Sequence, residues 1–353
     1  MKLVILGDTH IGARNDSVIF HELFKKFYSE TLFPYMEENE IDTIVQLGDL
    51  FDRRKYINFQ SLAMAKEYLF NELEQRGITL HTLLGNHDVF YKNTLKVNST
   101  GLVLGEYNNI IMYDKPTIIY FEDVQFDVIP WICEDNIAEC TDFISNSKSD
   151  FCFGHFELAG FEMDRGTICH EGQDASSLRR YETVFTGHFH HRSKNGNIYY
   201  IGTPYEMTWS DHNDPKGFVV FDTDTREHEF IENPHTIFRK ISYDDTDMYV
   251  GDLTEDMFEQ YKGKYVKVVV VKKSNAFLFE TFIDNMMKCG AIDVTVVEDF
   301  TEVSVSDELH EVDQADDTTT ILEKYVDSIE IDLNKTKLKA IIKEIYTEAL
   351  TIE

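Results

Sequence analysis

The segment Lys2-Leu-Val-Ile-Leu-Gly-Asp-Thr-His10 runs from an apolar stretch through a glycine to two side chains that can bind a metal ion. The same order returns in four further segments: Gly48-Asp-Leu-Phe-Asp52, Gly85-Asn-His-Asp88, Gly154-His155 and Gly187-His-Phe-His190. Binding sites of α/β sheets assemble outside the carboxyl ends of strands, and glycine permits a sharp turn there. The five segments therefore predict one site built from five strand ends.

The residue types in these segments indicate metal chemistry. Carboxylate, amide and imidazole donors together suit Mn²⁺, Fe²⁺ or Zn²⁺, and the lack of thiolates speaks against a structural zinc site. A carboxylate that bridges two ions leaves three further protein ligands for each, which makes seven. Taken singly, each motif is more often a turn, a helix cap or a core histidine. The seven candidate ligands are Asp8, His10, Asp49, Asn86, His155, His188 and His190.

The first 240 residues alternate short apolar runs with helical stretches, which predicts a layered α/β domain. We expect strands over 2–6, 42–47, 79–84, 117–121, 125–129, 151–154, 183–186, 198–201 and 217–222. We expect helices over 17–38, 59–76, 99–106, 135–147 and 174–179.

Composition excludes several classes of protein. A hydrophobic fraction of 42% with 26 Phe and 18 Tyr excludes a wholly disordered chain. No apolar run approaches the roughly 20 residues that span a bilayer, and no secretory signal is recognisable, so we expect a cytoplasmic protein with five reduced cysteines. The net charge of −31 by itself argues against nucleic-acid binding. Bound metal ions, however, can reverse the sign of the potential locally.

The character of the sequence changes after Ile241. A strand over 265–271, a helix over 275–288 and a strand over 292–297 predict a small β-α-β module. Residues 301–319 are acidic and predict a flexible linker. Two apolar stripes in 320–353 predict a helical hairpin, which either binds a partner or packs back on the parent domain.

The motif order D-x-H, G-D-x-x-D, G-N-H-D, G-H and G-H-x-H resembles the calcineurin-like metallophosphoesterases over residues 1–225. The resemblance implies a β-sandwich of two mixed sheets flanked by helices, with two divalent metal ions at the strand ends. It places Asp8, His10, Asp49 and His190 on one ion. Asp49 as bridge, Asn86, His155 and His188 would bind the other. It also implies that His87 is the catalytic histidine and that Asp88 orients it.

Further features resemble the SbcD-type DNA repair nucleases, especially the nuclease subunits of T-even-type phage recombination endonucleases. These features are Arg53-Arg-Lys55 after the second motif, Thr82-Leu-Leu-Gly-Asn-His-Asp88 and Tyr200-Ile-Gly-Thr-Pro204. The resemblance implies a nuclease domain over 1–240, a capping domain that helps DNA to reach the metals over 241–300, the linker, and an ATPase-binding hairpin over 320–353. It implies a homodimer through helices near 59–76 and 92–106; Leu62, Ala65, Leu69 and Leu73 could serve that contact or the core.

The implied activity is 3′→5′ exonuclease on duplex DNA and endonuclease on single strands, with Mn²⁺ or else Mg²⁺. The chain would be the catalytic subunit of an SbcCD-like complex in DNA double-strand-break repair and recombination, encoded by a phage and acting in bacterial cytoplasm. Some family members have His where this chain has Asp52, which leaves the balance of the two activities open. The alternative is a phosphatase or phosphodiesterase for small substrates on the same dinuclear centre.

Several basic residues near the motifs are candidates for phosphate contacts, although each alone is more often a solvated surface residue. Together they make DNA binding independent of base sequence plausible. They are Arg14, Arg53, Arg54, Lys55, Lys92, Lys96, Arg165, Arg179, Arg180, Arg192 and Lys194.

Overall fold

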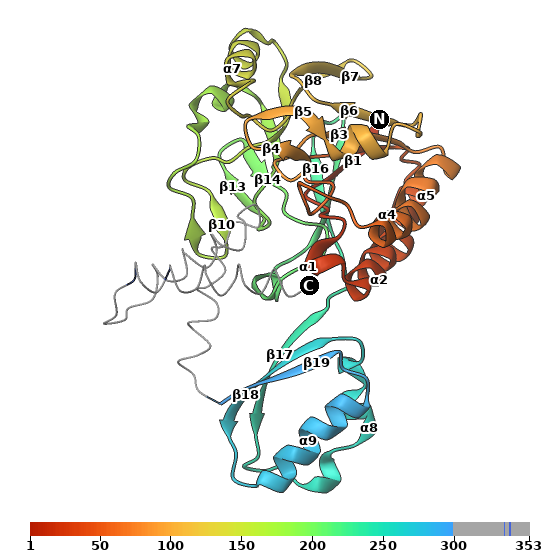
Figure 1. Ribbon diagram of the computed structural model, residues 1–353, viewed down its shortest axis with the longest axis vertical. Coiled ribbons are helices and arrows are strands. Elements are labelled where there is room, and N and C mark those ends of the chain that lie inside the picture. Colours follow the sequence, from red (N-terminus) through yellow and green to blue (C-terminus); the bar gives the residue numbers. More distant parts are fainter. Residues whose placement is uncertain (299–334, 336–338, 340–353) are drawn as a thin grey trace.

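The computed structural model describes residues 1–298 together with Lys335 and Lys339. Two six-stranded mixed sheets pack face to face, and helices cover their outer faces (Figure 1). The expected β-sandwich flanked by helices is therefore confirmed. The predicted linker over 301–319 lies outside the described residues, as does the hairpin over 320–353 apart from Lys335 and Lys339.

The first sheet has the strand order β16-β15-β1-β2-β3-β6. Strands β1, β2, β3 and β6 are parallel, whereas β15 and β16 add to the edge beside β1 as antiparallel strands. The carboxyl ends of the parallel strands therefore meet at one edge. The bounds are β1 (Lys2–Leu6), β2 (Thr43–Gln46), β3 (Thr79–Leu83), β6 (Ile110–Tyr113), β15 (Gly217–Asp222) and β16 (His228–Glu232).

The second sheet has the order β13-β14-β12-β9-β8-β7. Its four inner strands are parallel, and both outer strands are antiparallel to their neighbours. The carboxyl ends of β9 and β12 thus lie side by side. The bounds are β7 (Thr117–Phe121), β8 (Val124–Ile129), β9 (Phe151–His155), β12 (Thr183–Gly187), β13 (Ser193–Asn195) and β14 (Ile198–Tyr200).

The core between the sheets is largely aromatic. The ring of Phe126 stacks on that of Phe153 with centroids 4.7 Å apart, and Phe221 from the first sheet lies 5.5 Å from Phe126. Strand β1 is buried on both faces: Leu3 and Ile5 join this core, while the alternate side chains join the core under the helices. Burial on both faces explains why this strand is an unbroken apolar run.

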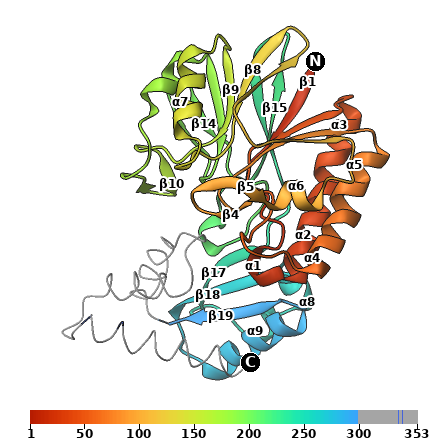
Figure 2. The same cartoon turned by 45° about the horizontal axis from the view of Figure 1, so that its top comes forward.

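Two helical runs cover the first sheet (Figure 2). Each contains a π-helical turn in its middle, a feature that often marks functional or strained segments. The first comprises α2 (Val18–Phe27), η1 (Tyr28–Leu32) and α3 (Phe33–Glu38). The second comprises α4 (Phe59–Ala65), η2 (Lys66–Phe70) and α5 (Asn71–Gln75).

The apolar positions proposed for a dimer contact lie in this helical layer. Ala65, Leu69 and Leu73 are buried in the core cluster, and Leu62 packs against it partly buried. These four residues thus serve the core of the described chain.

The expectation of a helix over 92–106 is wrong for its first half, because a hairpin of β4 (Val89–Tyr91) and β5 (Thr94–Asn98) precedes a short α6 (Ser99–Val103).

The outer face of the second sheet packs against α7 (Ile137–Asn146) and the 3₁₀ helix η3 (Ala175–Arg180). Both elements were expected as helices. A small hairpin of β10 (Glu162–Asp164) and β11 (Thr167–Ile168) lies in the loop after β9, and the 3₁₀ turn η4 (Trp209–Asp211) precedes β15.

A third, separate sheet follows the sandwich (Figure 1). Its parallel strands are β17 (Phe238–Asp244), β18 (Tyr265–Lys272) and β19 (Asp293–Val297). Helix α9 (Ala276–Lys288) packs on the sheet around a core of its own, with α8 (Glu255–Phe258), η5 (Val250–Asp252) and η6 (Glu259–Tyr261). The expected strand, helix and strand are confirmed. The sheet has one strand more than expected. This strand is β17, which begins at Phe238, just before the expected domain boundary at residue 241.

Membrane-spanning helices and cysteines can be examined within residues 1–298. No helix in this part of the chain is long and apolar enough to cross a membrane. All five cysteines lie in it, all are free thiols, and four of them are buried.

Candidate metal centre

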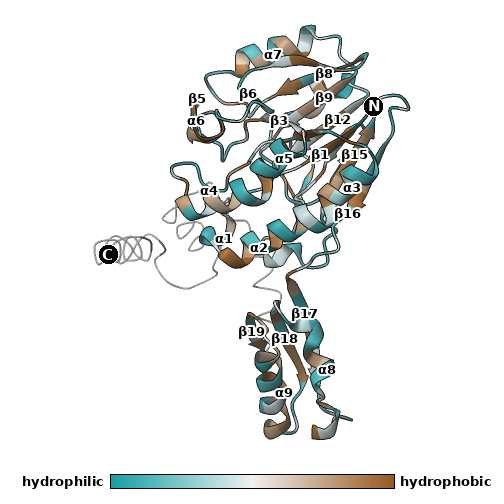
Figure 3. Ribbon diagram, turned by 90° about the vertical axis from the view of Figure 1, so that its right-hand side faces the viewer, coloured by the Kyte–Doolittle hydropathy of each residue, from teal (hydrophilic) through white to brown (hydrophobic). Residues whose placement is uncertain are grey.

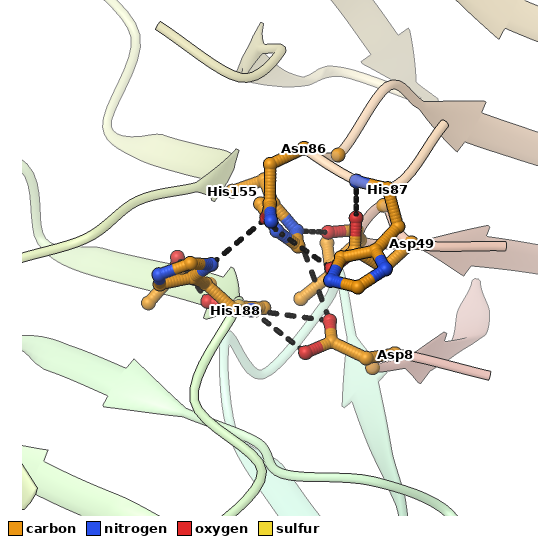
Figure 4. A network of polar contacts seen from close by, with 12 residues as sticks. Asp8, Asp49, Asn86, His87, His155 and His188 are labelled. Atoms are coloured by element: carbon orange, nitrogen blue, oxygen red, sulfur yellow. Dashed lines mark hydrogen bonds and ion pairs between the residues drawn. The ribbon is translucent and has the colours of Figure 1, made fainter. Parts of the chain in front are cut away.

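The five motifs come together at the carboxyl ends of β1, β2, β3, β9 and β12 (Figure 4). Two groups of side chains there hold their ligand atoms within 4.8 Å of one another. Both sheets contribute to each group, because the sandwich brings the two sets of strand ends to the same place. The groups are Asp8, His10 and His190, and Asp49, His155 and His188.

In the first group, two imidazole nitrogens face each other. Nε2 of His10 lies 3.0 Å from Nε2 of His190, and Oδ2 of Asp8 lies 3.9 Å from the same nitrogen of His190. His10 and Asp8 are wholly buried. A buried cluster of converging nitrogen and oxygen donors is the ligand set that transition-metal ions prefer.

In the second group, the seventh expected ligand joins the donors. Oδ1 of Asn86 lies 2.9 Å from Nε2 of His155 and 3.0 Å from Nδ1 of His188. Oδ2 of Asp49 is 3.3 Å from Nε2 of His155 and 3.8 Å from Nε2 of His10. Asp49 therefore faces both groups.

Outer contacts fix the orientation of these ligands. Nδ1 of His155 lies 2.7 Å from the carbonyl oxygen of Leu47, to which it donates, so that Nε2 remains directed at the donors. The backbone N–H of His188 donates to Asp8 at 2.9 Å. Such contacts set the tautomer and direction of metal-binding histidines. The residues present thus fit a pair of divalent ions in donor chemistry and in orientation.

The backbone of the ligand loops is strained. His10, Asp49 and His188 have positive φ values of 42°, 53° and 90°, a region that side chains other than glycine seldom adopt. Positive φ costs of order 1–3 kcal/mol per residue and concentrates at functional sites. The surrounding structure must therefore hold these three side chains in place.

Two glycines leave space that the carboxylates occupy. A Cβ on Gly85 would lie 2.1 Å from Oδ1 of Asp49, and one on Gly187 would lie 2.3 Å from Oδ1 of Asp8. Both distances are far shorter than a van der Waals contact. Glycine is thus required for close packing behind the ligands as well as for the turn.

Replacing Gly85 with alanine should therefore disable the site without removing a ligand. The added methyl group must displace the Asp49 carboxylate, and we expect weaker metal binding by at least about tenfold, as for the loss of an outer contact. Calorimetric titration with Mn²⁺ measures the effect. The matched control is Gly251→Ala, where nothing lies within 4 Å of the added Cβ and the backbone is not in the positive-φ region. Unchanged Mn²⁺ affinity in Gly85→Ala would contradict this packing argument.

The carboxylates control the protonation of the histidines. Burial lowers the pKa of His10 and His155, but the neighbouring carboxylates outweigh it and raise both pKa values to about 9. Asp52 and Asp49 act on His10, and Asp49 and Asp8 act on His155. Burial instead lowers the pKa of His188 to about 3. Two buried rings are thus cationic at pH 7 in the metal-free protein.

Metal binding should consequently release protons. Metal ions bind neutral imidazole, so the protons of His10 and His155 must leave when a metal ion binds at pH 7. Because both pKa values are raised, the cost of deprotonation falls as pH rises towards 9, and the apparent metal affinity should rise over that range. Calorimetry of Mn²⁺ binding in two buffers of different ionisation enthalpy counts the protons. We expect the release of about two protons per protein. Release of no protons would contradict the raised pKa values.

His87, the remaining histidine of the motifs, lies at the edge of the donor groups. Its backbone N–H donates to Oδ1 of Asp49 at 2.7 Å, and its Nδ1 lies 2.5 Å from the carbonyl oxygen of Asp52. The ring centroid is 4.9 Å from that of His10. With Nδ1 held by a carbonyl, Nε2 is the atom of this ring that can exchange a proton with a substrate.

Asp88 has a different place from the one expected. Its carboxylate is buried and accepts backbone N–H groups from Leu50, Phe51 and Gly85 at 2.9–3.2 Å. It therefore ties the second motif loop to the third. Among the described residues, the His87 ring is held instead by the Asp52 carbonyl, which accepts a hydrogen bond from Nδ1.

Sequence reasoning missed several supporting residues. Gln46 is buried, and its amide bonds to the backbone of Gly48; a lone polar residue in an apolar strand was the available signal. Lys216 is buried between Asp211 and Asp214 at 2.7 and 2.8 Å and donates to the carbonyl oxygen of His190. Nothing in the local pattern distinguishes this lysine from a surface residue.

The ring of Trp131 is a further missed neighbour. Its centroid lies 5.2 Å from that of His188 and 5.9 Å from that of His155. His191, to which no role was assigned, places Nδ1 2.8 Å from Oδ1 of Asp214. It is therefore part of the support around Lys216.

Comparison with known proteins supplies the family. Residues 1–221 match the model of the family described as calcineurin-like phosphoesterase, which is well over half of the chain. The chain is a calcineurin-like phosphoesterase. It is 35% identical to exonuclease subunit 1 of Enterobacteria phage T4 over 353 residues, which cover 99% of both chains. The resemblance found in the motifs, including that to a phage nuclease, is thus confirmed.

Other similarities are more distant. A putative phosphoesterase of Invertebrate iridescent virus 6 is 22% identical over 295 residues, which are 80% of this phosphoesterase and 98% of the viral protein. Among solved structures, an archaeal phosphodiesterase matches 66% of this chain and all of its own, with 12% identity and a TM-score of 0.34. The family match and the phage relative, not these distant similarities, make the chain a hydrolytic enzyme of a family that uses divalent metal ions.

Proposed function

We propose that this phosphoesterase is a DNA nuclease that uses two divalent metal ions, most simply Mn²⁺, with Mg²⁺ as the alternative. The observation that carries the proposal is the pair of donor groups, three side chains each, that share one buried site with Asn86 and His87. Two ions, when bound, would activate water and stabilise the attacking and leaving oxygens of a phosphodiester.

Asp8, His10 and His190 would hold one ion, and Asn86, His155 and His188 the other, with Asp49 between them. The protein's own contribution to the reaction is then the placement of a proton. His87 donates from Nδ1 to the Asp52 carbonyl, so Nε2 is the ring atom left for the substrate, and the cationic ring would carry there the proton that it gives to the leaving oxygen. Asp88 acts as a positioning residue, because it ties the loop of Asp49 to that of His87.

DNA is favoured as substrate by the full-length similarity to a phage exonuclease subunit and by basic residues that follow the second motif, Arg53 to Lys55. The net charge of −31 opposes this attraction. Binding to DNA should therefore be weak for the isolated protein and should fall steeply with salt. We propose 3′→5′ exonuclease action on duplex DNA and endonuclease action on single strands.

The same proposal includes partners. The chain would be the catalytic subunit of an SbcCD-like complex for double-strand-break repair and recombination in bacterial cytoplasm, bound to a coiled-coil ATPase through residues 320–353. It would form a homodimer. Deletion of 320–353 should abolish capture of the ATPase while DNA cleavage by the truncated protein persists; retained capture would contradict the role of this segment.

The deciding experiment compares substrates and metals. The purified protein is given labelled duplex DNA, single-stranded DNA and bis(p-nitrophenyl) phosphate, with Mn²⁺, Mg²⁺ or chelator. Cleavage of DNA that requires metal supports the nuclease. Hydrolysis of the small ester with intact DNA, also after addition of the ATPase, supports the alternative of a phosphatase or phosphodiesterase for small substrates.

A further inference from the structure

Three exposed aromatic side chains follow directly after two of the motif loops. Tyr56 lies four residues after Asp52 and is 60% exposed. Phe90 and Tyr91 lie three and four residues after His87 and are 38% and 52% exposed. Single exposed aromatic side chains are common on protein surfaces, but here three of them lie together beside a candidate site.

The two segments that carry these rings run beside each other. Nδ1 of His87 contacts the Asp52 carbonyl at 2.5 Å, and Nε of Arg54 donates to the Val89 carbonyl at 3.2 Å. Residues 53–56 and 90–92 therefore form one surface, which we name the aromatic rim. Phe90 lies three residues after His87, and three residues of chain span at most about 11 Å. The rim therefore begins within about three nucleotide steps of His87.

The aromatic rim is basic as well as aromatic. It contains Arg53, Arg54, Lys55 and Lys92 and no acidic residue, in a chain of net charge −31. The guanidinium of Arg53 lies over the ring of Tyr56 at 4.9 Å and pairs with Asp16 at 2.8 Å, which fixes its position. The seven residues of the rim are thus positively charged as a group, with Asp16 beside Arg53.

Phe90 and Tyr91 stand at an angle to each other. Their ring centroids are 4.8 Å apart with an interplanar angle of 72°, an edge-to-face contact that covers one face of one ring only. A ring face left uncovered can accept a nucleobase. Basic side chains interleaved with aromatic rings are the usual means of binding single-stranded nucleic acid.

We propose that the aromatic rim binds unpaired nucleotides of the DNA strand that enters the metal centre, with bases stacked on the rings and phosphates on the basic side chains. The proposal rests on the nuclease function above and adds a preference for frayed or single-stranded ends. Fully paired bases have their faces covered by neighbouring bases and cannot stack in this way. A second copy of the chain is the less suitable occupant, because two basic surfaces repel each other.

The test uses the full chain with His87→Ala, which keeps the DNA intact. Two hairpin DNAs are compared, one blunt and one with four unpaired 3′ nucleotides that include 2-aminopurine. Binding should quench 2-aminopurine in the unpaired tail as it stacks. Tyr56→Ala, Phe90→Ala and Tyr91→Ala should each weaken binding of the tailed DNA by about 5- to 100-fold and of the blunt DNA by less. Tyr91→Trp, which keeps a ring, should retain both binding and quenching.

The matched control is Tyr120→Ala on β7, which removes a 64% exposed tyrosine from the far edge of the second sheet and should change neither affinity. The rim proposal would be overturned if the rim variants lost equal affinity for tailed and blunt DNA, or lost no affinity. Light scattering that shows a dimer become a monomer in Phe90→Ala and Tyr91→Ala would overturn it in favour of a contact between copies. If the protein with His87 intact fails to bind or cleave any DNA, with and without the ATPase, the nuclease itself is refuted. If it cleaves DNA and the rim variants bind DNA as before, only the rim proposal is refuted.

Discussion

Replacing His87 with alanine is expected to slow phosphodiester hydrolysis by about 10²–10⁴-fold while both metal ions remain bound. The expectation follows from the geometry of the ring. Its Nδ1 is held by the Asp52 carbonyl and Nε2 is left for the substrate, so that the ring serves proton transfer rather than the seven-residue ligand set. Single-turnover cleavage of DNA measures the rate, and elemental analysis of the same samples counts the ions.

The control for this variant is His170→Ala, which removes an exposed histidine outside the donor groups. Its cleavage rate should stay within about twofold of the parent protein, as expected for a surface substitution. Full activity of His87→Ala would refute the role of the ring. Loss of metal together with activity would make His87 a metal ligand instead.

Replacing Asp49 with asparagine is expected to have a still larger effect. Its carboxylate faces both donor groups and also accepts the N–H of His87, so one substitution alters both ion sites and the position of the catalytic ring. Each metal ion supplies several kcal/mol of charge stabilisation, and we expect the rate to fall by at least about 10³-fold. Elemental analysis should find fewer than two ions per chain.

A suitable control is Asp127→Asn, which alters a carboxylate that is equally buried but remote from the donors. Asp127 binds Ser149 and Tyr181 at 2.5 and 2.6 Å, so its loss should lower the melting temperature and leave the metal content at two. An Asp49→Asn protein that keeps two ions and near-normal cleavage would show that Asp49 is dispensable at both sites.

The positions of the site residues follow from the sequence because the signal is local. Each ligand comes directly after an apolar run and a glycine, and parallel strands place such positions at one edge. Asp8 and His188 belong to different sheets, 180 residues apart, yet the N–H of His188 reaches Asp8. The five segments predicted one common site, and the resemblance to a known family added that two sheets supply its strand ends.

The roles of Asp88 and Asp52 did not follow from the sequence. The family resemblance implied that Asp88 orients the neighbouring His87, but the turn directs its carboxylate to N–H groups of the second loop and of Gly85. The ring is held by a backbone carbonyl, a group that every residue has and that no sequence pattern can reveal. The Asp211–Lys216–Asp214 network escaped prediction because its charges resemble those of an exposed loop.

Parts of the fold were also read incorrectly. In residues 94–98, Leu95 and Val97 alternate with polar residues, which is the period of a strand. We nevertheless assigned this short run to the helix that follows it. Strands β6, β16 and β17 were not expected. All three lie at an edge of their sheets, where mixed polar and apolar residues weaken the pattern that marks a buried strand.

The seven side chains that we propose as metal ligands divide between the two halves of the sandwich. Asp8, His10, Asp49 and Asn86 follow strands of the first sheet, and the three remaining histidines follow strands of the second. Bound ions would therefore act as cross-links, and the sheets could separate only after the ions dissociate. By thermodynamic linkage, an ion present at 1,000 times its dissociation constant adds about 4 kcal/mol to the free energy of unfolding. Chelation should accordingly lower the melting temperature, and metal supply would regulate how long the enzyme survives as well as how fast it cleaves.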